Sequence, residues 1–357
     1  MYIYKRILFY IFKPLNPIDV EDNRSVYAFS IFTRFVRLIN GDVRQIFLIT
    51  KHALLKIISI FYIIPSFFIF FLKYKFIYIN FWQIGAPPQE IGTLVKYLKF
   101  SGFNENKIIV LNPSLISLTA KTNKLYKKNI IVIENFFLYL ILLPFLLIKN
   151  VTIKPYLADS SHSISKYNLI NKLYETKFKN NEIFKIEKKE KNNLKKIVKN
   201  IDLKKFVVIN IRQNKKYFSY RNVSKIKNYK KSINFLLKKN FHVVRFMDLS
   251  DQKLNIKHKN FHQLNSEKIN LYEQIKFYKF AKFSIVTQSG PAGYASILNT
   301  PFILTNSIDI GTDLTPKKSD IIIYKNKNKT NKKNKLYSDN TSIQILNSVK
   351  KMCKEIY

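Results

Sequence analysis

Short apolar runs alternate with helical patterns over most of the chain after residue 75. Apolar runs occupy residues 76–82, 107–111 and 130–133, and a loop with glycine and proline follows the first of them. A helix is predicted after that loop, through Leu94, Val95 and Leu98. Continuous apolar runs separated by helices are typical of strands that are buried on both faces of a parallel sheet. The first half of the chain is therefore predicted to contain an open α/β sheet.

The same alternation returns after residue 206. Residues 176–200, between the two blocks, are rich in Lys, Glu and Asn and are expected to form a solvated helical linker. The fold class that follows is α/β, with two Rossmann-like lobes. The second block has predicted strands at 206–212, 241–246, 283–287 and 302–305, and predicted helices at 228–239, 271–280 and 341–356.

Three apolar stretches could lie against a membrane. Residues 57–72 are almost wholly apolar, but sixteen residues with Pro65 inside them fall short of the roughly 20 that span a bilayer. A monotopic or interfacial anchor fits them better, and a tilted short span is the alternative. Residues 27–48 resemble a basic amphipathic helix that lies on anionic lipid or packs on its own domain. Residues 136–148 indicate a buried helix, a hydrophobic loop or part of the same membrane-facing surface.

These patterns divide the chain of 357 residues into about two domains with extensions. We expect an N-terminal helical apolar and basic extension over 1–74, associated with a membrane, and a first lobe with its linker over 75–200. The second lobe is expected over 201–335, followed by a C-terminal helix over 336–357.

The charge is strongly basic, with 62 Lys and Arg against 22 Asp and Glu and a formal net charge of +40. Such an excess favours nucleic acid, an anionic membrane or a phosphorylated ligand as partner. However, only eight of the basic residues are arginine, and the abundant Lys, Asn, Ile, Phe and Tyr all have A/T-rich codons. Base bias alone would therefore produce this surface. No nucleic-acid-binding motif is present, so we expect no specific nucleic acid as partner.

The sequence argues against a metal site and against disulfides. Cys353 is the only cysteine, and the five histidines do not have the spacing of metal ligands. No Asp-x-Asp triplet is present to hold a divalent metal on a nucleotide. We expect neither a metal nor another cofactor.

Two features at predicted strand ends indicate an anion site. The turn Thr287-Gln288-Ser289-Gly290 follows an apolar strand and precedes a helix, which would place backbone N–H groups and a hydroxyl where phosphate binds. A purely structural turn is the alternative. Arg212 ends another buried strand, where open α/β sheets place ligand-binding residues. Arg221 lies in the loop after it, and Arg245 ends the next strand, where an ion pair with Asp248 is the alternative to ligand contact.

The order of these motifs resembles a family of bacterial glycosyltransferases from surface-polysaccharide gene clusters, with the GT-B architecture of two Rossmann-like lobes facing a cleft. The resemblance covers about residues 50–320 and is strongest in the second lobe. The family usually has His-x-Arg where this chain has Asn210-Ile211-Arg212, so a role for an imidazole at 210 is in doubt. The matching stretches are 81–92, 207–212, 220–222 with Tyr229, 241–248, 283–290, 300–306 and 313–317.

The resemblance implies a nucleotide-sugar donor in the second lobe and transfer to a glycan or lipid-linked acceptor at the cytoplasmic face of the inner membrane. Fixed donors would stabilise the leaving diphosphate without a metal. An inverting reaction needs a base in the first lobe; Glu90 is the first candidate, with Asp159 and His162 behind it, although the carboxylate of Glu90 also suits a helix N-terminus. The implied donor-binding residues are Arg212, Arg221, Asn222, Arg245, Asp248, Gln288, Ser289, Gly290 and Asn306.

Two other functions are compatible with the sequence. The net charge of +40 with interspersed Tyr and Phe would also suit a basic nucleic-acid-binding protein. A membrane-associated scaffold that retains the GT-B-like fold without catalysis is the other alternative. Binding of a nucleotide sugar separates both from the enzyme.

Overall fold

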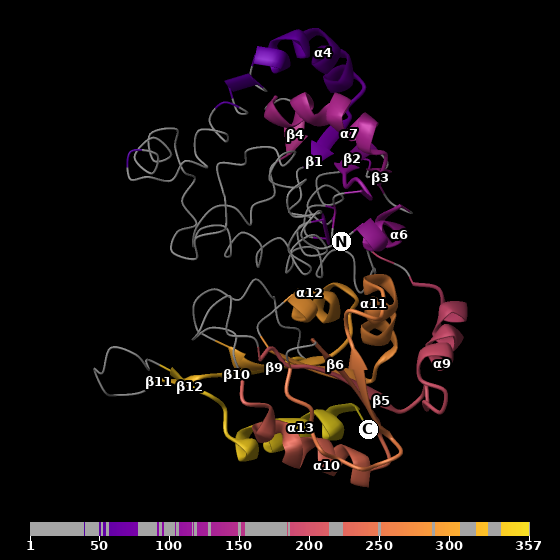
Figure 1. Cartoon of the computed structure of the whole chain (residues 1–357), viewed down its shortest axis with the longest axis vertical. Coiled ribbons are helices and arrows are strands. Elements are labelled where there is room, and N and C mark those ends of the chain that lie inside the picture. Colours follow the sequence, from indigo (N-terminus) through magenta and orange to yellow (C-terminus); the bar gives the residue numbers. More distant parts are fainter. Residues whose placement is uncertain are drawn as a thin grey trace. The chain divides into compact units, whose positions relative to one another are not determined.

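The structure is a computed structural model, drawn in Figure 1. The chain divides into two compact units, Met1–Lys177 and Phe178–Tyr357. This division lies before the lobe boundary at 200/201 that we predicted. The residues that the structure describes are 39, 50, 53–54, 57–77, 91–92, 95, 104, 107–115, 117, 120–127, 130–148, 151–153, 184, 186–213, 224–248, 251–287, 290–307, 319–327 and 337–356.

Unit 1 contains a parallel sheet of short strands. These are β1 (Lys75–Ile77), β2 (Ile108–Leu111), β3 (Ile131–Ile133) and β4 (Thr152–Ile153), in the order β3-β2-β1-β4. The first three begin at or within one residue of the apolar runs in the sequence. Parallel strands are joined by crossovers rather than by hairpins, and η2 (Ala120–Thr122) and α6 (Asn123–Tyr126) lie in the crossover between β2 and β3.

Residues 136–148 form a helix, α7 (Phe136–Leu142), and a 3₁₀ turn, η3 (Leu143–Leu147). Asn135 caps α7, because its Oδ1 accepts the N–H of Leu138 at 3.0 Å. Phe145 stacks on Phe76 of β1 with ring centroids 5.0 Å apart, so η3 packs against the sheet. Within this stretch Tyr139 is buried and Phe137 is exposed; contact with a membrane stays a prediction.

Unit 2 contains a larger parallel sheet, whose six strands have the order β10-β9-β8-β5-β6-β7. In chain order this is the arrangement 3-2-1-4-5-6 of a doubly wound fold, with β5 as its first strand. The predicted strand 283–287 is confirmed in full. The strands are β5 (Phe206–Asn210), β6 (His242–Met247), β7 (Phe261–Asn265), β8 (Phe283–Thr287), β9 (Phe302–Ser307) and β10 (Ile321–Tyr324).

Helices cover both faces of this sheet, as Figure 1 shows. One face carries α10 (Lys230–Lys238), the preceding η7 (Ile226–Tyr229) and α13 (Ser342–Ile356). Their apolar side chains pack on Val207, Ile209 and Ile285 in one buried cluster. The other face carries α11 (Leu271–Phe280) and α12 (Gly290–Ile297), and Phe277 of α11 contacts Phe206 at a centroid distance of 6.2 Å. Burial on both faces explains the continuous apolar runs of these strands.

The stretch that we expected to be a solvated linker packs on unit 2. It forms η5 (Lys188–Asn193) and α9 (Leu194–Ile197), and Leu194 is fully buried. Glu190 accepts a hydrogen bond from Tyr272 of α11 at 3.1 Å and lies 3.4 Å from the ammonium of Lys276. The contacts of Glu190 therefore fasten this segment to α11.

The apolar stretch 57–72 is largely helical and contains α4 (Ile63–Phe71). Among the described residues we find no helix with both the length and the apolar character that crossing a bilayer requires. A short hairpin, β11 (Asn326–Lys327) with β12 (Tyr337–Ser338), completes the described elements of unit 2.

Candidate functional site

The strand order of unit 2 reverses between β5 and β8, which are neighbours in the sheet. The chain after β5 continues to the helices on one face of the sheet, and the chain after β8 continues to α12 on the other face. Such a switch point leaves a crevice outside the carboxyl ends of the strands, where doubly wound folds bind ligands. Arg212 follows β5 at this point, and its backbone N–H donates to Oγ1 of Thr287, the last residue of β8, at 3.2 Å. The predicted arginine therefore lies at the switch point, and a hydrogen bond joins its backbone to the end of the neighbouring strand β8.

Helix α12 begins at Gly290, three residues after the end of β8. Its first N–H groups have no partner within the helix, and the helix dipole makes this end positive. Thr287, Arg212 and the start of α12 thus surround one strand end. The arrangement suits an anion that accepts several hydrogen bonds.

Ser224 connects Arg212 to Asn306, another predicted site residue. The backbone N–H of Ser224 donates to the carbonyl oxygen of Arg212 at 3.0 Å. Its hydroxyl oxygen accepts a hydrogen bond from Nδ2 of Asn306, at the end of β9, at 2.8 Å. The structure therefore brings Arg212 and Asn306 together through a third residue, Ser224.

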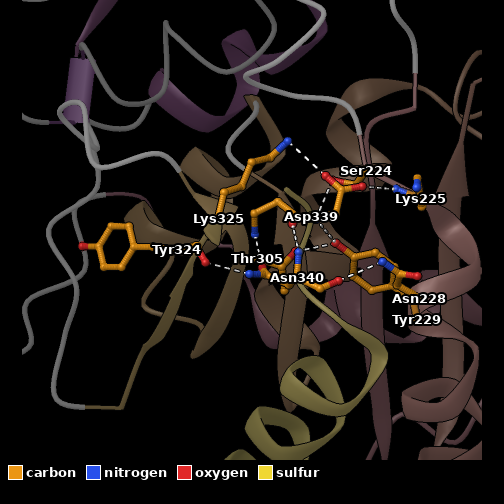
Figure 2. A network of polar contacts seen from close by, with 10 residues as sticks. Ser224, Lys225, Asn228, Tyr229, Thr305, Tyr324, Lys325, Asp339 and Asn340 are labelled. Carbon is orange, nitrogen blue, oxygen red and sulfur yellow. Dashed lines mark hydrogen bonds and ion pairs between the residues drawn. The ribbon is translucent and has the colours of Figure 1, made fainter. Parts of the chain in front are cut away.

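Asn306 and Asn340 exchange two hydrogen bonds between backbone and side chain. The N–H of Asn306 donates to Oδ1 of Asn340 at 2.5 Å, and the N–H of Asn340 donates to Oδ1 of Asn306 at 2.6 Å. Both residues are buried, and Asn306 has a φ of 54°, a left-handed conformation that Asn tolerates better than most residues. Asn340 also donates to the carbonyl oxygen of Tyr324 (Figure 2) at 2.7 Å.

Tyr229 lies in the same buried network. Its hydroxyl group is 2.7 Å from Oγ1 of Thr305 (Figure 2) and accepts a hydrogen bond from Nδ2 of Asn306 at 3.1 Å. Burial raises the pKa of Tyr229 to about 12, against the opposing effect of its hydrogen bonds. Tyr229 is therefore a neutral hydroxyl that fastens η7 to β9.

Asp339 attaches two further segments to the network. Its carboxylate lies 3.1 Å from the ammonium of Lys325, whose side chain is 4% exposed, and accepts the N–H of Lys225 at 3.0 Å. Figure 2 shows both contacts beside Asn340. An ion pair this close to the interior needs further hydrogen bonds to offset its lost hydration, and the network supplies them. The residue before η7, the end of β9 and the residue after β10 are thus held together.

Arg245 and Asp248 interact with different partners. Arg245 is fully buried within β6, where its guanidinium donates to Oε1 of Gln263 at 2.7 Å and to the carbonyl oxygen of Gln252 at 2.9 Å. Asp248 is exposed beyond the strand end and accepts a hydrogen bond from Ser266 at 2.7 Å. Arg245 therefore holds the 252–254 segment against the sheet instead of forming the ion pair with Asp248 that we considered.

Several predicted site residues lie outside the described residues: Glu90, Arg221, Asn222, Gln288 and Ser289, together with Asp159 and His162. Their roles stay predictions. Among the residues that are described, no group of three or more His, Cys, Asp or Glu side chains is placed to hold a metal ion. The expectation of a reaction without metal also stays a prediction.

Sequence reasoning missed Ser224, Asp339 and Asn340. Ser224 is twelve residues beyond Arg212, and Asn340 is 34 residues beyond its partner Asn306. The only signal available was that polar residues follow the ends of apolar strands. That signal does not say which loops meet.

Unit 1 also gathers polar groups at the carboxyl ends of two strands. Asn112 follows β2 and donates through Nδ2 to Oδ1 of Asn123 at 2.5 Å, while Asn123 donates to Glu134, which follows β3, at 2.9 Å. Burial alone would raise the pKa of Glu134, but hydrogen bonds from Lys127 and Asn123 outweigh it and lower the pKa. Glu134 is therefore a carboxylate near neutral pH.

The comparisons with known proteins agree with this architecture. No protein-family model matches the sequence, and no curated protein is significantly similar to it. The chain is similar to the solved structure of the E. coli ADP-heptose LPS heptosyltransferase II, with a TM-score of 0.52, 12% identity, and coverage of 79% of this chain and 99% of that one. It is also similar to the glycosyl transferase family 9 structure from Veillonella parvula DSM 2008, with a TM-score of 0.56, 10% identity, and coverage of 78% and 96%. The described residues thus have a Rossmann-like α/β fold similar to that of these two transferases.

Proposed function

We propose that the protein is a glycosyltransferase that moves a sugar from a nucleoside diphosphate sugar to a glycan or lipid-linked acceptor of the cell surface. The observation that carries this proposal is the switch point of unit 2, where Arg212, Thr287 and the start of α12 surround one strand end. The likeness to two sugar transferases over more than three quarters of the chain supports it.

The chemistry assigned to this point is stabilisation of a leaving group. An acceptor hydroxyl oxygen forms a bond to the anomeric carbon, and the bond from that carbon to the diphosphate oxygen breaks. The electron pair leaves with the diphosphate, whose added negative charge must be stabilised. In this proposal the guanidinium of Arg212 and the N–H groups at the start of α12 are the donors for that charge, and the step uses no metal.

The nucleotide is assigned to the neighbouring strand ends. Asp248 follows β6, the second strand of unit 2 in chain order, and doubly wound folds place the acidic residue that binds ribose hydroxyls there. Asn306 holds the Arg212 segment in place through Ser224 and acts as a positioning residue. Arg245 supports the same edge from inside the sheet.

The acceptor and the base belong to unit 1 in this proposal. We place the two units on either side of a cleft, in the GT-B manner, with Glu90 as the base that takes the proton of the acceptor hydroxyl. Because the name of the E. coli structure specifies ADP-heptose, ADP-linked sugars are the first donors to test.

Binding of nucleotide sugars to the full-length protein tests the proposal. In a thermal-shift panel of ADP-, UDP-, GDP- and CMP-sugars with EDTA present, at least one ADP-sugar should raise the melting temperature. Arg212→Ala should weaken that binding at least about tenfold, because a charge-assisted pair to phosphate is lost. Arg212→Lys should recover part of it, since lysine restores the charge without the planar fork.

Lys238→Ala, an exposed change on α10, is the matched control and should bind like the unchanged protein. No stabilisation by any donor would refute the proposed function. Donor binding that Arg212→Ala leaves intact would refute only the assignment of the diphosphate site.

A further inference from the structure

Unit 1 carries an exposed apolar surface that two separate segments build. Of the 19 large hydrophobic residues exposed in the described part of the chain, eleven lie between 54 and 72 and three lie on α7. We call these fourteen residues the apolar cap. They are Leu54, Ile57, Ile60, Phe61, Ile63, Ile64, Phe67, Phe68, Phe70, Phe71, Leu72, Phe137, Leu138 and Ile141.

The two segments belong to one surface. Tyr62, just before α4, contacts Phe145 of η3 with ring centroids 4.9 Å apart, and η3 directly continues α7. Figure 1 shows α4 next to α7 at the end of unit 1. Ser66 is the only buried residue of α4, and its hydroxyl donates to the carbonyl oxygen of Ile63 at 2.6 Å. Helix α4 thus exposes apolar side chains on most of its circumference, unlike a surface helix with one polar face.

Lysines border the cap at the carboxyl end of α4. Lys73 follows the helix and is exposed. The ammonium of Lys75 lies 5.1 Å from the ring centroid of Phe70, and that of Lys107 donates to the carbonyl oxygen of Leu72 at 2.9 Å. Apolar surface bordered by ammonium groups matches acyl chains bordered by anionic headgroups.

We propose that the apolar cap inserts into one leaflet of an anionic phospholipid bilayer, with Lys73, Lys75 and Lys107 at the headgroups. A second copy of the chain is a poorer occupant, because its lysines would meet these lysines. The residues directly before the cap do not complement its charge either. Residues 24–53 have five Lys and Arg and a single acidic residue, Asp42.

The size of α4 suits one leaflet. Its nine residues make a helix about 14 Å long, about half of a hydrocarbon core of roughly 30 Å. Exposed apolar residues of ordinary monomers are scattered singly, whereas those of the cap are contiguous. Large contiguous apolar patches mark interaction sites. This inference stands apart from the proposed sugar transfer, because it uses none of the residues of the switch point.

Flotation with lipid vesicles tests the inference on the full-length protein. Vesicles with about 30% phosphatidylglycerol in phosphatidylcholine should carry the protein to the top of a density gradient. Phe68→Glu with Phe71→Glu should lower the bound fraction at least about tenfold, because charges then replace two inserted side chains. Ile343→Glu is the matched control: Ile343 is 60% exposed on α13 of unit 2, as Phe68 is 62% exposed on α4. It should bind like the unchanged protein.

A fluorescent label shows what covers the cap. In a Cys353→Ser background, which removes the only cysteine, Phe68→Cys carries an environment-sensitive dye, and Ile343→Cys carries it in the control. Vesicles should shift the emission of the dye at 68 to shorter wavelength and leave that at 343 unchanged. A dye at 68 that is already shielded without lipid would show that the chain itself or a second copy covers the cap. That result, or binding that the double variant retains, would overturn the inference.

Discussion

The buried bonds between Asn306 and Asn340 make a quantitative prediction about the stability of unit 2. Asn306→Gly keeps the backbone freedom that a φ of 54° requires but removes the side chain. The buried N–H of Asn340 then loses its acceptor, and Ser224 loses the donor Nδ2. An unsatisfied buried donor costs about 1–3 kcal/mol, so we expect Asn306→Gly to destabilise the protein by about 2–4 kcal/mol.

Asn306→Ala should destabilise by about 1 kcal/mol more, because alanine in addition adopts the left-handed conformation at a cost. Asn240 provides the control: it has a φ of 58° after α10 but an exposed side chain. Asn240→Gly should change stability by less than about 0.5 kcal/mol. The difference in stability between the alanine and the glycine variant should be about the same at position 240 as at position 306, because both positions have a left-handed backbone. The comparison of the two sites separates the effect of the backbone from that of the hydrogen bonds.

Urea unfolding followed by circular dichroism measures these differences, provided that the m-value stays constant. Hydrogen exchange of peptides from β9 and α13 shows whether the loss is confined to unit 2. If Asn306→Gly costs no more than Asn240→Gly, the buried network adds nothing to stability. The structural role assigned to Asn306 would then be refuted.

Two further predictions concern titratable groups in unit 2. The ring nitrogens of His242 and His262 lie 3.2 Å apart, and burial lowers the pKa of both histidines. The unfolded chain therefore binds more protons below a pH of about 6.5, so stability should fall as the pH decreases from 7.5 to 5.5, by up to about 1.4 kcal/mol per pH unit for each histidine. His262→Gln should flatten this slope in urea unfolding at several pH values; an unchanged slope would exclude the pair as its source. Lys276 lies 2.7 Å from Glu273 and 3.4 Å from Glu190, so Lys276→Met should cost about 2–4 kcal/mol by leaving two carboxylates close together. Adding Glu190→Gln and Glu273→Gln should restore much of the melting temperature, and a triple variant as unstable as the single one would contradict this reasoning.

The pattern of apolar positions predicts the elements of unit 2 well. Residues 271–280 and 283–287 form α11 and β8 with the predicted bounds, because a strand buried on both faces has a continuous apolar run. Strand β7, with the sequence Phe-His-Gln-Leu-Asn, escaped prediction. It lies at the edge of the sheet and is only half-buried, so its sequence is not constrained to be apolar.

The location of a candidate site was also readable from the sequence, since Arg212 and the residues before Gly290 follow apolar strands. The order of the strands was not readable, and it is this order that puts β5 and β8 side by side and places Arg212 at a switch point. Local sequence specifies a strand through burial and turn signals. Which strands pair depends on how the helices of the whole unit fill both faces.

Particular partners were decided by the tertiary structure alone. Arg245 looked like a ligand contact or an ion pair, yet folding buries it, and its guanidinium donates to Gln263, eighteen residues away. Ser224 and Asn306 meet although they are 82 residues apart. A buried polar group needs a hydrogen-bond partner, and the sequence shows which polar residues are in predicted buried strands. Only the packed fold decides which distant group meets it, because nothing in the local pattern encodes contacts across loops.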